Sequence, residues 1–177
     1  MEAVMEYIFT FKYLLYDHDG DEEALIDRLF EAGCDDALPG VGQAGRLALA
    51  FAREAESATA ALESAIADVR KAVDNAELVE VLPDYAGLTD IAEHVGMSRQ
   101  NLRKIATKND PTFPAAIHEG NPSLWHLSDA LSWFTEHGYA VEAATLEISA
   151  AARELNTAIQ ARRMSVDRSR ELEALMA

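Results

Sequence analysis

The pattern of apolar and polar positions divides residues 1–84 into strands and helices. Residues 7–15 alternate between the two kinds, and a period of two indicates a half-buried β-strand. The face of this strand that we expect to be buried is aromatic: Tyr7, Phe9, Phe11 and Tyr13. In residues 21–32 and 57–73 the apolar positions recur at helical spacing, so both segments are predicted helices.

Further strands complete this part of the chain. Residues 37–38 and 46–51 bracket the glycine-containing segment 39–42, which predicts a hairpin that turns at these glycines. Residues 76–82 form a last strand before Pro83. The resulting order β-α-β-β-α-β is that of the split β-α-β arrangement of ferredoxin-like domains. We therefore expect a core in which the aromatic face of the first strand packs under two helices.

Residues 88–105 have the pattern of a helix-turn-helix. Thr89 is a predicted N-cap for a short first helix, because a threonine side chain can accept a hydrogen bond from the exposed amides of the first turn. Ile91 and Ala92 are expected to face the core. Gly96 can turn the chain at the helix end, because glycine adopts a left-handed backbone conformation without strain.

A second helix is expected to follow Ser98, with Leu102 and Ile105 as its buried anchors. Side chains that can contact DNA are left pointing outward, and the candidates are Ser98, Arg99, Gln100, Asn101, Arg103 and Lys104. Arginine, glutamine and asparagine can read base edges in a major groove, so Arg99, Gln100, Asn101 and Arg103 are the expected base readers. Lys104 and Ser98 are expected to contact phosphate. An ordinary two-helix corner with a solvated charged face would show the same pattern.

A hairpin and another helix are predicted after this corner. Residues 113–118 are extended, residues 119–123 are rich in turn formers, and residues 124–127 return. Ser128 is a predicted N-cap for the next helix, in which Leu131 and an aromatic residue pack back on the corner.

The order helix, turn, helix, wing, helix resembles the MerR-like winged-helix group, especially small AlpA-type prophage regulators and excisionases. The resemblance covers residues 86–138 and depends on four features: Phe113-Pro114 opening the wing, Gly120 at its tip, Trp125 leading into the next helix and Trp133 within it. It implies a DNA-binding fold with the second helix in a major groove and the wing near the backbone or minor groove. Such wings commonly carry Arg or Lys at the tip, whereas this tip offers Glu119, Asn121 and Ser123.

The region from Val141 onward is rich in alanine and free of glycine and proline, which predicts one long helix. Apolar or small side chains recur at three-four spacing along it: Val141, Thr145, Ile148, Ala152, Leu155 and Ile159. The stripe is narrow and has charged flanks. We favour its use in self-association, and packing on the rest of the same chain is the alternative.

The charge distribution limits the partners of each part of the chain. The formal net charge is −16, which is unusual for a protein that binds a polyanion. Residues 1–84 hold 6 basic and 19 acidic side chains, whereas residues 85–138 hold 4 and 6. Most of the repulsion therefore comes from the N-terminal part. The same acidity, and the absence of a Gly-Phe-aromatic pattern in residues 46–51, argue against RNA binding by that part.

Several kinds of chemistry are not supported. A calcium loop beginning at Asp17 would need glycine and glutamate where the chain has Glu22 and Arg28. Cys34 stands alone and is expected to be a packing residue, and the histidines lack metal-ligand spacing. No phosphate-binding glycine loop or catalytic set is present, so we expect neither an enzyme nor a cofactor. The sequence has no uninterrupted apolar run of about 18 residues, so a cytoplasmic protein without a membrane segment is expected.

The sequence therefore predicts an α+β protein: a ferredoxin-like domain over residues 1–84, a winged helix-turn-helix over 85–138 and a C-terminal helix over 139–177. The expected function is sequence-specific binding of double-stranded DNA by a homodimer, as in bacterial or prophage-type transcriptional regulators. The alternative is an antitoxin-like or adaptor protein whose acidic N-terminal domain binds a partner protein. That domain could also form a dimer through its open sheet face or take a small ligand, and its sequence does not choose among the three roles.

Overall fold

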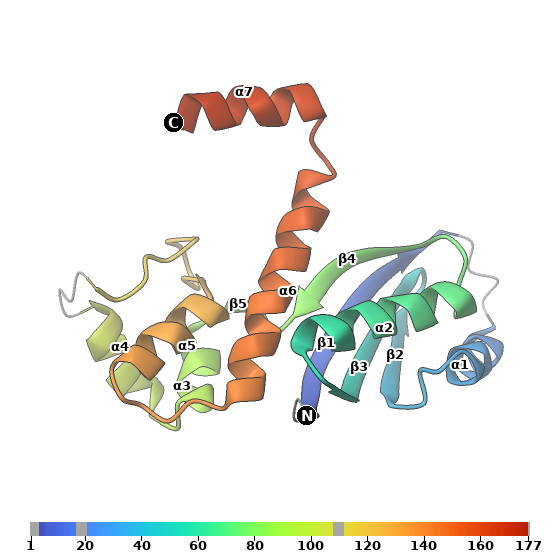
Figure 1. Cartoon of the computed structure of the whole chain (residues 1–177), viewed down its shortest axis with the longest axis horizontal. Coiled ribbons are helices and arrows are strands. Elements are labelled where there is room, and N and C mark those ends of the chain that lie inside the picture. Colours follow the sequence, from blue (N-terminus) through green and yellow to red (C-terminus); the bar gives the residue numbers. More distant parts are fainter. Residues whose placement is uncertain (1–3, 17–20, 108–111, 177) are drawn as a thin grey trace.

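The computed structural model describes residues 4–16, 21–107 and 112–176, and it has the mixed helix and strand content that the sequence predicts (Figure 1). The N-terminal sheet contains β1 (Met5–Leu15), β2 (Ala37–Gln43), β3 (Arg46–Ala55) and β4 (Ala76–Leu82). A second, short pair is formed by β5 (Tyr85–Ala86) and β6 (Trp125–His126). The helices are α1 (Glu22–Glu31), α2 (Ala58–Ala72), α3 (Leu88–His94), α4 (Arg99–Thr107), α5 (Leu127–Glu136), α6 (Ala143–Ala161) and α7 (Val166–Met176).

The N-terminal sheet is antiparallel throughout, with its strands in the order β2-β3-β1-β4. The strands predicted at residues 7–15 and 76–82 and the helices predicted at 21–32 and 57–73 are confirmed to within two residues at each end. Side-chain caps explain where both helices begin. Asp21 Oδ1 accepts a hydrogen bond from the Ala24 amide at 3.0 Å, and Ser57 Oγ accepts one from the Ala60 amide at 3.1 Å. The preceding residues 17–20, where the rejected calcium loop would begin, lie outside the described residues.

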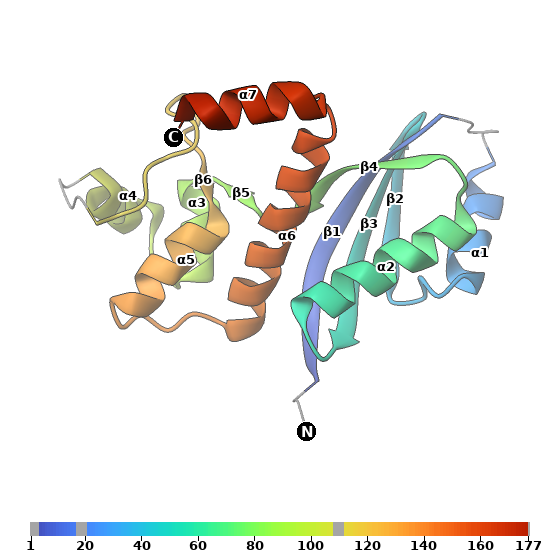
Figure 2. The same ribbon diagram turned by 45° about the horizontal axis from the view of Figure 1, so that its top comes forward.

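The aromatic face of β1 forms the centre of the core, as predicted. Tyr7, Phe9, Phe11 and Tyr13 are all buried, and the rings of Phe9 and Phe51 stack with centroids 5.0 Å apart. Figures 1 and 2 show α2 lying across this face of the sheet. The opposite face carries exposed apolar side chains that include Ile8 and Leu38.

The hairpin between β2 and β3 turns later than the sequence suggested. The glycine-containing segment 39–42 belongs to β2 itself, and the turn is at Ala44 and Gly45, where Gly45 has φ +73°. A strand can hold Pro39 here because β2 is at the edge of the sheet, where a missing amide hydrogen costs no ladder bond.

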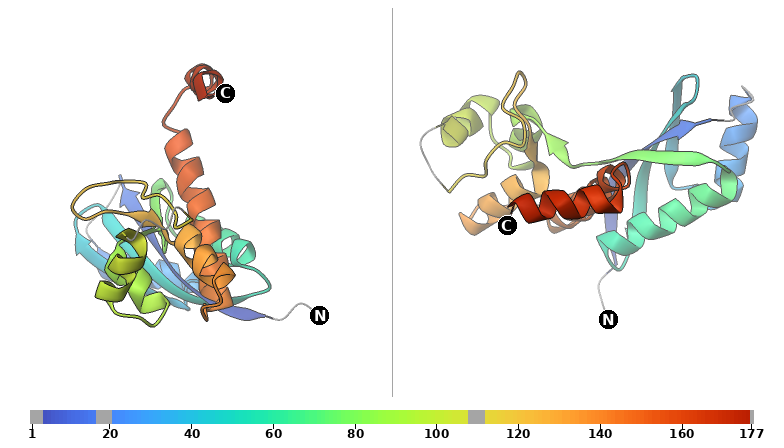
Figure 3. Two further views of the ribbon diagram at one scale, coloured as in Figure 1. Left: turned by 90° about the vertical axis from the view of Figure 1, so that its left-hand side faces the viewer. Right: turned by 90° about the horizontal axis from the view of Figure 1, so that it is seen from above.

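The predicted long C-terminal helix is wrong in two respects. The helix is interrupted after Ala161, so α6 and α7 are separate helices that point in different directions (Figures 1 and 3). The apolar stripe also packs on its own chain, since Ile148, Ala152 and Ile159 are buried in the core of the N-terminal sheet. The alternative of a helix packed on the same protein is therefore correct for α6, which stands between the sheet and the α3–α5 unit.

A buried asparagine joins α6 to the edge of the sheet. Asn156 is 3% exposed, and its side chain bonds both the backbone N–H and the backbone C=O of Val81 at 2.8 Å. Its amide also donates to Asp84 Oδ2 at 2.8 Å. The other carboxylate oxygen of Asp84 lies 2.6 Å from Nδ1 of His126, and the Asp84 carbonyl accepts from the Leu127 amide. Asp84 therefore connects β4, α6 and the start of α5.

A buried arginine organises the region between β3 and the two N-terminal helices. The Arg53 guanidinium makes a two-pronged bond to Asp36, at 2.6 and 2.9 Å, and bonds Asp68 at 3.0 Å. It also donates to the Gly33 carbonyl and to Ser64 Oγ. A buried charge is tolerated only with such partners, and this network supplies one for each guanidinium nitrogen.

None of the helices in the described ranges combines the length and the apolar composition that a membrane crossing requires.

Candidate nucleic-acid interface

The predicted corner between two helices is present, and glycine makes its turn. Helix α3 ends at His94, Val95 is its C-cap, and Gly96 follows with φ +64°, in the left-handed region. The Met97 amide donates to the Ala92 carbonyl at 2.9 Å, and the Gly96 amide donates to Glu93 at 3.2 Å. These bonds form a Schellman motif, which closes the end of α3 and starts the chain toward α4.

The predicted cap of α3 is wrong by two residues. The helix begins at Leu88, with Gly87 at the N-cap, and Thr89 lies inside the first turn. Glycine has no side chain to cap with, but the Asp90 carboxylate accepts a hydrogen bond from the Gly87 amide at 2.8 Å. This reciprocal bond from the third helical position stabilises the start of α3 in place of a threonine cap. Ile91 and Ala92 are buried, as predicted.

Helix α4 presents the candidate side chains to solvent from a fixed base. Ser98 Oγ accepts a hydrogen bond from the Asn101 amide at 3.2 Å, which confirms Ser98 as the cap. Leu102 is fully buried, and Ile105 is partly buried against the same cluster. The six candidates are all exposed: Ser98, Arg99, Gln100, Asn101, Arg103 and Lys104.

Helical geometry divides these candidates between the centre and the flanks of the exposed face. At about 100° per residue, Gln100 and Lys104 lie nearly opposite the buried Leu102. Arg99 and Arg103 lie on the flank that lines a groove beside the wing, and Asn101 lies on the other flank, near Tyr139. Lys104, expected from sequence to be a phosphate contact, is thus as central as the expected base reader Gln100.

The predicted wing hairpin is present only as a single bridge, because the predicted return segment 124–127 pairs with β5 through β6 and then begins α5. His118 and Leu124 form an antiparallel bridge, with the Leu124 amide donating to the His118 carbonyl at 3.0 Å. Between the wing and α4 lies a groove of about 950 Å³. Arg99 and Arg103 line its helix side, and the wing side includes Glu119 and Asn121.

Two tryptophans hold the base of the wing against α5. Trp125 Nε1 donates to the Pro114 carbonyl at 3.1 Å, and Trp133 Nε1 donates to Thr112 Oγ1 at 3.0 Å. The Phe113 ring packs edge-on to Trp133, with centroids 5.2 Å apart. The Phe-Pro segment is therefore fixed by both of the tryptophans that the sequence singled out.

The start of α5 differs from the prediction. The helix begins at Leu127, with His126 at the N-cap, so Ser128 lies inside the first turn. The Asp84 carbonyl accepts the Leu127 amide at 2.7 Å and takes over part of the capping role. Ser128 is buried, and its hydroxyl has no hydrogen-bond partner within the described ranges. The sequence offered no sign of this contact, because Asp84 and Leu127 are far apart along the chain.

The electrostatics of α4 differ from those of the whole chain. The helix contains no acidic residue, and within the described part of the chain Arg99, Arg103 and Lys104 form no ion pair. Other cations are already paired, as Lys12 is with Glu80 and Arg153 is with Asp129. The α4 cations thus remain available to an external anion.

The described residues contain no cluster of three or more His, Cys, Asp or Glu side chains that could hold a metal ion. Comparison of the chain with protein families, with curated proteins and with solved structures found no match.

Proposed function

We propose that this protein binds double-stranded DNA in a sequence-specific manner through α4 and acts as a transcriptional regulator of bacterial or prophage type. The observation that supports this most directly is the exposed face of α4, where three cations that have no carboxylate partner among the described residues stand beside Gln100 and Asn101. The turn before it and the hairpin after it agree with a winged helix-turn-helix related to the MerR-like group. The strand order of the N-terminal sheet likewise supports a ferredoxin-like domain.

The geometry refines the expected roles on DNA. Gln100 and Lys104 point straight away from the core, so they enter deepest if α4 lies in a major groove. Arg103 flanks them and can form a two-pronged bond to guanine. Arg99 faces the groove beside the wing and is placed for phosphate, while Asn101 reads from the opposite flank.

The acidity of the chain sets the expected strength of binding. Three α4 cations per protomer predict a slope of log affinity against log salt of about −3 for one protomer and about −5 for two. The acidic N-terminal part opposes non-specific binding, because its carboxylates repel phosphate at distances within a Debye length. Specific affinity is thus expected to require two protomers on a two-fold-symmetric site.

Within the C-terminal part, α7 is the region that we expect to contact a second copy of the chain. None of its residues is buried, and its exposed apolar side chains include Val166, Leu175 and Met176. A helix of 11 residues is marginal on its own in water, because most helical stability in proteins comes from packing. Pairing of two α7 helices would bury these side chains and bring two α4 helices to one DNA.

The alternative function, binding of a partner protein by the N-terminal domain, is supported by the open face of the sheet. Ile8 is 61% exposed and Leu38 is 76% exposed on this face. A pull-down that captures a partner through this face, together with no sequence preference on DNA, would favour this alternative.

Selection of binding sites from a random duplex library tests the proposal, followed by fluorescence anisotropy on the selected site and on scrambled DNA over a salt series. Arg103→Ala should weaken binding to the selected site by about 1–3 kcal/mol and change binding to scrambled DNA much less. Arg28→Ala is the matched control, since it removes one exposed positive charge from α1, far along the chain from α4. Selection that enriches no site, or equal losses for both variants, would contradict the proposal.

A further inference from the structure

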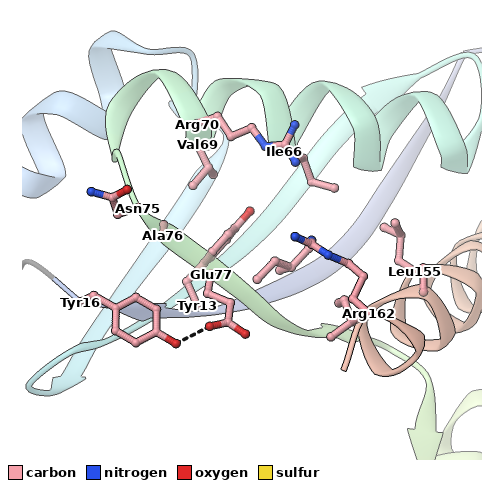
Figure 4. A pocket seen from close by; sticks show the side chains of 13 residues that line it. Tyr13, Tyr16, Ile66, Val69, Arg70, Asn75, Ala76, Glu77, Leu155 and Arg162 are labelled. Carbon is pink, nitrogen blue, oxygen red and sulfur yellow. Dashed lines mark hydrogen bonds between the residues drawn. The ribbon is translucent and has the colours of Figure 1, made fainter. Parts of the chain in front are cut away.

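A hollow lies between α2 and α6, above the ends of β1 and β4 (Figure 4). Its volume is about 510 Å³, within the range of about 300–1,000 Å³ that is usual for small-molecule sites. Its lining is part apolar and part polar, and the apolar part includes Ile66, Val69, Leu78, Leu155 and Ile159. The hollow is thus large and apolar enough for the body of a small organic molecule.

Tyr13 forms the inner part of this hollow. The side chain is 4% exposed, and its hydroxyl has no hydrogen-bond partner among the described residues. In Figure 4 the ring rises from the sheet into the space between the two helices. Burial raises the pKa of Tyr13 well above its usual value, so the hydroxyl keeps its proton and can donate. A buried donor without a partner is unfavourable, and a ligand acceptor would remove that cost.

Two arginines reach the same space from opposite sides. Arg70 comes from the last turn of α2, and Arg162 comes from the C-terminal end of α6 (Figure 4). In the described part of the chain neither forms an ion pair with a carboxylate. Glu77 is the acidic residue of the lining, and its carboxylate already accepts a hydrogen bond from the Tyr16 hydroxyl. The lining is therefore positive on balance, in a chain of net charge −16.

The geometry points to a binding site for a small organic carboxylate with an apolar body: the body lies against Ile66, Leu155 and Ile159, and the carboxylate meets Arg70, Arg162 and the Tyr13 hydroxyl. Guanidinium groups suit this headgroup because their N–H donors match the two oxygens of a carboxylate. The Arg70 and Arg162 side chains are exposed and long, so they can move to meet a ligand in the hollow. This site does not depend on DNA binding, and it can be tested without DNA.

The test is a titration of the full-length protein with octanoate, followed in two-dimensional amide NMR spectra and by calorimetry. Octanamide is the matched neutral probe, because it has the same chain and no charge. Octanoate should saturate one site, with the largest shifts at residues lining the hollow. Octanamide should bind at least tenfold more weakly.

Variants assign the binding to this hollow. The double variant Arg70→Gln with Arg162→Gln should weaken octanoate binding at least tenfold and leave octanamide unchanged. Ala158→Phe should abolish binding of both, because Ala158 is exposed on α6 and lines the hollow, so a ring there fills the space. Arg168→Gln is the charge control on α7 and should have no effect.

Four outcomes would overturn the proposal. Equal affinity for octanoate and octanamide would show that the arginines do not recognise the charge. Largest shifts away from the hollow, or octanoate binding that survives Ala158→Phe in a protein with an unchanged fold, would place the site elsewhere. Failure of both probes to bind would also refute it, whatever the result of the DNA experiment.

Discussion

Replacing Asn156 tests how the edge of the N-terminal sheet is closed. β4 is an edge strand, so the outward-facing N–H and C=O of Val81 have no neighbouring strand to pair with. The Asn156 side chain bonds both groups at 2.8 Å and thereby acts in place of a strand. Val81 is fully buried, so water does not reach these groups in the intact protein.

The expected loss in the free energy of unfolding follows from the polar groups that Asn156→Ala leaves without a hydrogen bond. These are two backbone groups of Val81 and one carboxylate oxygen of Asp84, and each buried unsatisfied group costs about 1–3 kcal/mol. Asp84 keeps His126 as a partner, which limits its share. We expect the free energy of unfolding to fall by about 3–5 kcal/mol, a large fraction of the 5–15 kcal/mol typical of a folded protein.

Urea unfolding followed by circular dichroism measures this loss. Thr157→Ala is the control, because Thr157 is the next residue of α6 and its hydroxyl bonds within the helix on the exposed side. It should change the free energy of unfolding by less than about 0.5 kcal/mol. A loss below about 1 kcal/mol for Asn156→Ala, with an unchanged urea slope, would refute the reasoning. It would mean that the groups of Val81 find other partners.

Further predictions concern buried polar groups. Tyr13→Phe should leave the stability of the ligand-free protein unchanged or raise it by up to about 1 kcal/mol in thermal melts, because the lost hydroxyl has no partner in the described part of the chain; clear destabilisation would reveal one. Arg53→Met should lower the free energy of unfolding in urea by about 3 kcal/mol, since Asp36 then loses its cation and Asp68 keeps only the exposed Lys71; a change below about 1 kcal/mol would mean that water screens the two carboxylates. Burial raises the pKa of Cys34 from 9.0 to about 11, so the proton stays on in the folded state between these values, and stability should fall as the pH rises from about 9 to 11. Thiolate absorbance should likewise appear near pH 11 in the folded protein, and its appearance near pH 9 would contradict the burial argument.

Local patterns predicted the elements whose causes are local. The alternation of residues 7–15 placed β1 and its buried aromatic face, because a period of two can satisfy one buried face only as a strand. Ser98 was a reliable cap since its hydroxyl reaches an amide three residues ahead. Gly96 marked the turn because few other residues adopt its positive φ.

The predicted helix starts are wrong where a distant or a reciprocal contact determines the first residue of the helix. Thr89 is a good cap by type, but the bond from Asp90 to the Gly87 amide starts α3 two residues earlier. Ser128 likewise is not the cap of α5, because the Asp84 carbonyl, from another part of the chain, accepts a hydrogen bond from the Leu127 amide. The Asp84 contact leaves no trace in the local spacing of residues, whereas Gly87 and Asp90 stand three residues apart, as in a capping box.

The largest correction concerns the apolar stripe of α6. Such a stripe requires a partner, but its spacing does not say whether the partner is a second copy or the same chain. Here the partner is the sheet of the same chain, since Ile148, Ala152 and Ile159 belong to its core. The exposure of the candidate residues 98–104 could be predicted from the sequence, because exposed side chains on a capped helix need no distant partner.

Helix α6 has a consequence for how the parts of the molecule depend on each other. Its buried residues complete the core of the sheet, while Leu146 near its start packs on the cluster that anchors α4. Its last turn lines the hollow beside Tyr13, and Asn156 ties its centre to β4 and Asp84. One rigid element thus contacts the proposed ligand site and the support of the proposed DNA-binding helix. If α6 had two alternative placements, a ligand with higher affinity for one of them would shift both regions toward that placement. A ligand with equal affinity for the two placements would shift neither region.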